Sequence, residues 1–117
     1  MDISKADEKL KFADYLLNRG EVEFLSAAMR HIVEASNIAV AVNFNLEDTN
    51  IARQIIGKKL SDGTKEEKEF CGSYLSLWKL ATNPSPAKSD VQKSLVRVRA
   101  FAEYVRRKRE FSASNIV

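Results

Sequence analysis

The chain has 117 residues, of which 44% are hydrophobic and 30% are charged, with four Gly, two Pro and one Cys. This length suits a single domain with its own core, and the composition excludes a disordered chain and a disulfide-stapled secreted fold. No stretch is long and apolar enough to predict a membrane span, and the charged N-terminal segment does not resemble a signal peptide, so we expect a cytoplasmic protein.

Two helices are predicted in the first half, because apolar residues recur there every three or four positions. Ser4 is a suitable N-cap and Gly20 a suitable C-terminal stop, so the first helix is predicted over residues 5–19. In the second helix an apolar stripe extends from Leu25 to Leu46 and has further apolar residues on both flanks. Such breadth is typical of a helix that contacts several neighbours, and we interpret it as an indication of a homodimer.

Three more helices are predicted in the second half. A short one covers residues 49–60, and the T-x-x-E capping box of Thr64 and Glu67 opens a longer one that ends near residue 82. After two prolines, which break the pattern, Ser89 and Gln92 form a second capping box, and the last helix is predicted over residues 90–110.

These elements predict an all-α fold, an up-and-down bundle of four long helices plus one short helix. The bundle is expected to form a single domain over residues 1–111, followed by a flexible C-terminal tail over residues 112–117.

Positive charge is concentrated in the last helix. Residues 93–110 contain seven Lys and Arg against two Glu, a net charge of +5, which leaves −2 for the rest because the whole chain carries +3. At helical spacing one ridge faces away from the apolar stripe and Arg109 falls on that stripe. The end of the helix is therefore predicted to run past the bundle and to project into solvent or against a second subunit. The candidate nucleic-acid-binding residues are Lys93, Arg97, Tyr104, Arg107, Lys108 and Arg109.

Three interpretations of this basic ridge (Lys93, Arg97, Tyr104, Arg107 and Lys108) are open, and one of them is contact with a protein partner. Cations contact phosphates and a base stacks on an aromatic ring, which indicates RNA or a nucleotide as the partner. Alternatively the ridge is a solvated face whose cations complement the dipole at the helix C-terminus.

Motifs for catalysis or metal binding are absent from the sequence. His31 is the single histidine, which excludes sites with two imidazoles, and a nucleophilic pair with Cys71 would need two helices to bring them together. Cys71 lies on an aromatic-rich helix face, where cysteine is typically packing. We therefore predict no catalytic residue, no metal and no cofactor. Tyr74 and Trp78, one turn apart, are either core residues or anchors of a protein interface.

The segment "KADEKLKFADYLLNRGEVEFLSAAMRHIVEASNIAVAV", residues 5–42, resembles the opening of HEPN-type prokaryotic helical domains. The resemblance implies a helical bundle that dimerises and acts as a ribonuclease through an Arg-x(4–6)-His motif, or as a non-catalytic partner of a minimal nucleotidyltransferase. No Arg lies four to six residues before His31, so the resemblance implies a member without the ribonuclease site.

The leading hypothesis is a non-enzymatic helical interaction module, a homodimer that contacts RNA or a nucleotide through its basic ridge. The alternative is a HEPN-like ribonuclease or toxin–antitoxin component that uses His31. A third hypothesis is a structural subunit that binds a protein through Tyr74 and Trp78.

Overall fold

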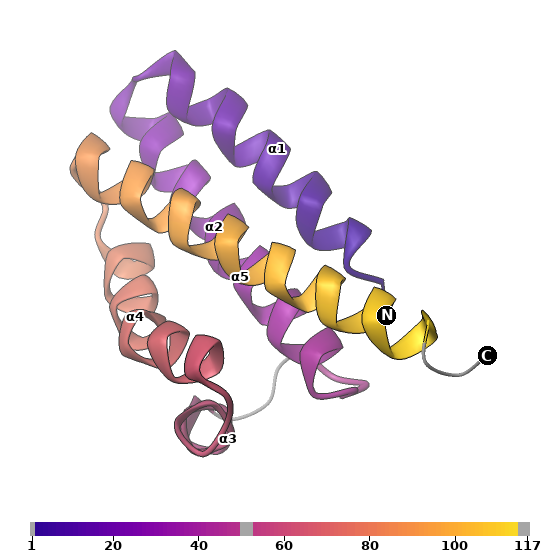
Figure 1. Cartoon of the computed structure of the whole chain (residues 1–117). Coiled ribbons are helices and arrows are strands. Elements are labelled where there is room, and N and C mark those ends of the chain that lie inside the picture. Colours follow the sequence, from indigo (N-terminus) through magenta and orange to yellow (C-terminus); the bar gives the residue numbers. More distant parts are fainter. Residues whose placement is uncertain (1, 50–52, 115–117) are drawn as a thin grey trace.

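In a computed structural model, residues 2–49 and 53–114 are described, and within these ranges the chain forms five helices and no strand (Figure 1). The prediction of an all-α fold with four long helices and one short helix is confirmed. The helices are α1 Ser4–Arg19, α2 Val22–Asn43, α3 Arg53–Ser61, α4 Lys65–Thr82 and α5 Lys88–Ser114. Among the described helices, none combines the length and the apolar content that a bilayer crossing requires.

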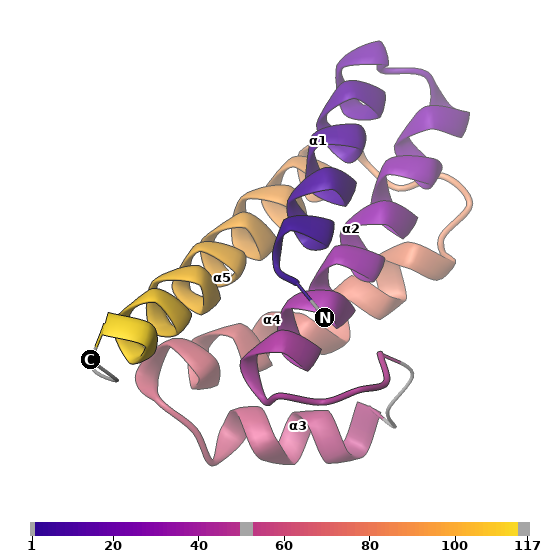
Figure 2. The ribbon, with the colours of Figure 1, turned by 90° about the vertical axis from the view of Figure 1, so that its right-hand side faces the viewer.

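Helix α2 is the centre of the packing. It contacts α1, α4 and α5, whereas α1 packs on α2 and α5, and the short α3 packs against α4 at one end of the bundle (Figure 2). Met29 and Ile32 of α2 are completely buried. Contacts within one chain therefore account for the broad apolar surface of α2. The breadth of α2 is therefore no longer an argument for a homodimer. The homodimer itself stays a prediction.

Several helix ends differ from the prediction. Helix α1 includes Ser4, whose backbone N–H donates to Asp2 Oδ1 at 3.1 Å, so the predicted Ser4 cap is wrong. Gly20 does end this helix, in the left-handed conformation with φ of 75°. Helix α2 ends at Asn43, before the predicted apolar stripe ends at Leu46. The reason is that Asn45 adopts φ of 54° and the chain turns there.

The later helices also have shifted ends. Residue 49 lies in a bend outside α3, whose described residues are Arg53–Ser61, and residues 50–52 lie outside the described residues. Helix α5 begins at Lys88, so Ser89 lies in its first turn and the predicted second capping box is wrong. At the other end α5 continues to Ser114, into the segment predicted as a flexible tail, of which residues 115–117 are not described.

Two valines on α5 test whether this helix packs as described. Val98 is completely buried and Val96 is 64% exposed, two residues away. Val98→Ala is expected to lower the free energy of unfolding by about 2 to 3 kcal/mol, because it removes buried methyl groups and leaves a cavity. Val96→Ala, the matched control, is expected to change it by less than about 0.5 kcal/mol. Urea unfolding followed by circular dichroism measures both, and equal effects would contradict the described packing.

Candidate functional site

A cleft follows the boundary between the antiparallel helices α4 and α5, and we call it the α4–α5 cleft. It consists of two adjoining hollows of about 300 and 370 Å³, which share Ser73 and Arg97 as lining residues. The first is lined by Glu66, Glu69, Phe70, Ser73, Arg97, Ala100, Phe101 and Tyr104. The second is lined by Ser73, Ser76, Leu77, Lys79, Leu80, Asp90, Lys93, Ser94 and Arg97.

The two hollows differ in charge. Lys79, Lys93 and Arg97 line the second hollow with Asp90 as its single acidic residue, so this half of the cleft is basic. The first hollow contains Glu66 and Glu69 beside its aromatic residues. Its aromatic wall is rigid, since the rings of Phe70 and Phe101 stack in parallel with their centroids 4.1 Å apart. A ligand in the cleft would therefore meet cations at one end and aromatic and acidic groups at the other.

The structure divides the candidate nucleic-acid-binding residues into two groups. Lys93 and Arg97 are exposed, line the cleft and have no hydrogen-bond or ion-pair partner among the described residues. Further along α5, Arg107 Nε contacts Glu103 Oε1 at 3.2 Å, which is a partly exposed pair within the helix. A cation without an internal partner can bind an external anion without breaking an ion pair of the protein. Lys93 and Arg97 are therefore the better candidates.

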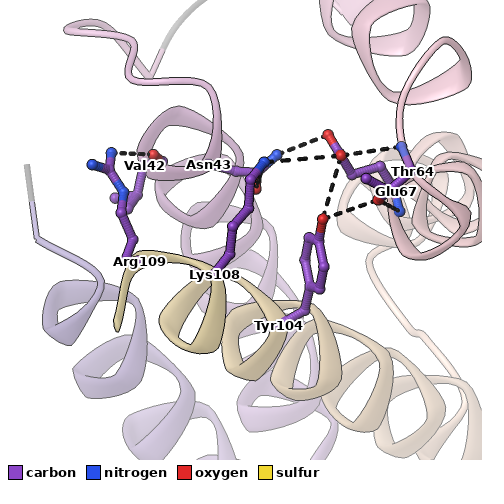
Figure 3. A network of polar contacts seen from close by, with 7 residues as sticks. All are labelled: Val42, Asn43, Thr64, Glu67, Tyr104, Lys108 and Arg109. Atoms are coloured by element: carbon purple, nitrogen blue, oxygen red, sulfur yellow. Dashed lines mark hydrogen bonds and ion pairs between the residues drawn. The ribbon is translucent and has the colours of Figure 1, made fainter. Parts of the chain in front are cut away.

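Lys108 and Arg109 are engaged with the C-terminal end of α2. Lys108 Nζ donates to Asn43 Oδ1 at 3.2 Å and lies 4.0 Å from Glu67 Oε1, and the Arg109 guanidinium donates to the Val42 carbonyl oxygen (Figure 3). Carbonyl groups at a helix C-terminus lack helical partners and carry partial negative charge, which attracts cations. Arg109 is exposed, as predicted, but its guanidinium group also turns back onto α2.

Glu67 is the centre of this network. It is 3% exposed and accepts hydrogen bonds from Asn43 Nδ2 at 3.0 Å and from the backbone N–H of Thr64 at 3.2 Å. The predicted capping box is confirmed, since the Glu67 backbone N–H also donates to Thr64 Oγ1. Burial acts to raise the pKa of Glu67, but hydrogen bonds from Thr64 and Asn43 and the charge of Lys108 prevail, so its pKa is lowered from the ordinary value.

Tyr104 joins α5 to the start of α4. Its hydroxyl lies 2.9 Å from Thr64 Oγ1 and donates to Glu67 Oε1 at 3.4 Å, and burial together with nearby carboxylates raises its pKa (Figure 3). The ring still lines the cleft, with Lys108 Nζ 5.9 Å from its centroid. Tyr104 therefore belongs to the cleft wall, held in place at its hydroxyl end.

The contribution of α4 to the cleft was not predicted from the sequence. Lys79 lines the basic half of the cleft, and the flank of α4 that accompanies it contains Ser73, Ser76, Leu77 and Leu80. Ser73, Ser76 and Leu80 recur at helical spacing beside the buried Leu77. This pattern is visible in the sequence, but it indicates a cleft wall only when α5 is known to lie alongside α4.

His31 and Cys71 have different surroundings. The His31 ring meets the Phe12 ring of α1 edge-on at 4.8 Å, its Nδ1 lies 3.9 Å from Glu34 Oε2, and burial lowers its pKa. Cys71 Sγ donates to the Gly57 carbonyl oxygen of α3 at 3.4 Å. His31 thus contacts α1 and Cys71 contacts α3, so the structure gives no support to a nucleophilic pair between them. The ribonuclease alternative stays a prediction.

The two candidate interface aromatics both pack inward. Tyr74 is 2% exposed, and its hydroxyl donates to Asn37 Oδ1 at 3.1 Å. Trp78 is half-buried against the core, edge-on to Tyr74 at 6.3 Å. Tyr74 is therefore inaccessible to a partner in this fold.

Among the described residues no group of three or more His, Cys, Asp or Glu side chains is placed to hold a metal ion. No protein-family model, no curated protein and no solved structure matches this chain, so the resemblance to HEPN-type domains stays a prediction.

The Glu67 network can be tested through the pH dependence of stability. Glu67→Gln places an amide opposite several donors and is expected to lower the free energy of unfolding at pH 7 by about 2 kcal/mol. Because the folded pKa lies below the ordinary value of 4.5, the unfolded state binds the proton first. The stabilisation is thus complete well above pH 4.5 and is lost as pH falls through the folded pKa, so the variant and the parent should converge in acid.

Urea unfolding at pH 7 and at decreasing acidic pH measures this convergence. Glu66→Gln is the matched control, since Glu66 is exposed at the neighbouring position, and it should change stability at pH 7 by less than about 0.5 kcal/mol. A gap between parent and Glu67→Gln that stays constant as the pH falls would contradict the role given to the ionised carboxylate.

Proposed function

We propose that this protein is a non-enzymatic interaction module that binds single-stranded RNA in the α4–α5 cleft. The observation that carries the proposal is the pair of exposed cations Lys93 and Arg97, which line the cleft and have no partner in the described part of the chain. Lys79 adds a third cation from the opposite wall. Phosphate groups are the anions that such a row of cations neutralises along a nucleic-acid backbone.

The other half of the cleft suits a base. Tyr104 supplies an aromatic surface there, and base–aromatic stacking contributes to RNA binding irrespective of sequence. Glu66 and Glu69 repel phosphate but accept hydrogen bonds from the amino groups of bases, as carboxylates do from cytosine. The proposed orientation therefore places the backbone along Lys79, Lys93 and Arg97, and the base towards Tyr104.

A single-stranded nucleic acid is favoured over a duplex because the hollows of the cleft are small and its cations are few. A flexible strand can turn its bases into a hollow of about 300 Å³, whereas the bases of a duplex are stacked and paired. We infer a modest affinity, since three cations provide far fewer phosphate contacts than the six to ten of a tight DNA-binding protein.

The cleft cations are tested with a double variant. Lys93→Ala/Arg97→Ala is expected to weaken binding of a short unstructured RNA by about tenfold and to reduce the slope of log affinity against log salt by about 1.4, because each phosphate contact of a single strand contributes about 0.7. Fluorescence anisotropy over a salt series measures both quantities.

Lys5→Ala/Lys11→Ala is the matched control, because it removes the same charge from α1, which does not line the cleft. This control should keep most of the affinity. An equal loss of RNA affinity in both double variants would mean that net charge alone accounts for the effect. A parent protein that binds no RNA at low salt would overturn the proposed function.

A further inference from the structure

The outer face of α1 carries two aromatic residues that the fold leaves exposed. Phe12 is 48% exposed and Tyr15 is 57% exposed, and their rings stack at 6.2 Å with an interplanar angle of 17°. The His31 ring of α2 lies nearly perpendicular to the Phe12 ring, with the centroids 4.8 Å apart. The pair is therefore a preformed apolar surface, and apolar surface of this kind gains free energy when it is buried.

Two charged residues lie in line with this aromatic pair. At about 100° per residue, Glu8, Phe12, Tyr15 and Arg19 fall within an arc of about 60° on α1, away from the buried Ala6, Leu10, Ala13 and Leu17. We call these four residues the α1 stripe. Figure 1 shows α1 at the edge of the bundle, with its other side against α2 and α5, so its outer face is open along its length.

The order of residues in the α1 stripe is self-complementary. It has an acid at one end, two aromatics in the middle and a base at the other end. If two copies of α1 lie antiparallel about a two-fold axis between positions 12 and 15, Phe12 of one copy faces Tyr15 of the second copy. In the same register Glu8 faces Arg19 of the second copy, and the symmetry axis repeats both pairs.

The charged ends are available for such contacts. Neither Glu8 nor Arg19 forms an ion pair within the described ranges. The Arg19 guanidinium carbon lies 5.3 Å from the centroid of the Phe24 ring, a cation–π contact that holds it at the end of the stripe and leaves its charge uncompensated. Each dimer would therefore form two new interchain ion pairs and break none.

We propose that the α1 stripe binds a second copy of this chain, as an antiparallel, two-fold symmetric α1–α1 pair. A second copy is the occupant that the stripe fits, because the same four residues supply both halves of every contact. A single pair of short helices buries less surface than a standard interface of about 800 Å² per partner, so the dimer forms at high protein concentration and dissociates on dilution. This interface does not involve the α4–α5 cleft.

Charge reversal tests the proposed register. Glu8→Arg and Arg19→Glu each place like charges opposite one another at both ends of the pair. Each single variant is expected to weaken self-association at least tenfold in sedimentation equilibrium, with its helix content unchanged by circular dichroism. The double variant Glu8→Arg/Arg19→Glu restores both ion pairs with their signs exchanged and should associate like the parent. Lys68→Glu on α4, which is exposed outside the stripe, is the matched control and should also associate like the parent.

A mixing experiment makes the result independent of any folding defect. Equal amounts of the two single variants restore both ion pairs in a heterodimer, because the two substituted positions face each other with opposite charges at one end of the pair and native Arg19 faces native Glu8 at the other. The mixture is expected to dimerise when each variant alone is monomeric. A parent protein that stays monomeric at about 0.5 mM, single variants that associate like the parent, or a mixture that stays monomeric would each overturn the proposal. RNA binding by the cleft is measured separately, so either proposal can fail alone.

Discussion

The buried carboxylate of Glu67 is the constraint on which the arrangement of the helices depends. A charge out of contact with water requires hydrogen bonds, and here they come from the end of α2 through Asn43, from the start of α4 through Thr64 and from α5 through Tyr104. Even the turn before α4 is adapted to it, since a Cβ at Gly63 would lie 2.9 Å from the Glu67 carboxyl carbon. By fixing α4 against α5 at one end, this network sets the course of the α4–α5 cleft.

The excess of positive charge in α5 is distributed among several structural tasks. Arg106 contacts Asp7, and Arg99 lies 3.6 Å from Asp14, so two cations join α5 to α1. Lys108 and Arg109 join it to the end of α2. Lys93 and Arg97 are left in the cleft without internal partners among the residues described. Lys108 and Arg109 thus complement the C-terminal end of α2 rather than that of their own helix, whose last turn has no basic residue, and the anion-binding interpretation is compatible with the N-terminal half of α5.

How much the sequence could predict depended on the range of the interaction. Local signals placed all five helices and identified the capping box of Thr64 and Glu67. They misplaced the first residues of α1 and α5. Ser4 and Ser89 are of a residue type that often caps helices, but the backbone before each of them is already helical or turned. The contacts of Glu67 with Asn43 and Tyr104 were beyond reach, because they join residues 24 and 37 positions apart.

The same limit applies to the broad apolar surface of α2 and to the α1 stripe. A broad apolar helix is consistent with burial by its own chain or by a second copy, and only the packing of α1, α4 and α5 around α2 decides between them. An exposed aromatic pair such as Phe12 and Tyr15 appears in the sequence as an ordinary part of an amphipathic helix. Because α1 does not line the cleft, a dimer formed through α1 would leave both copies of the cleft open to solvent. If one RNA strand reached both clefts, the dimer would bind it more tightly than a single copy, and this would compensate for the small number of cations in each cleft.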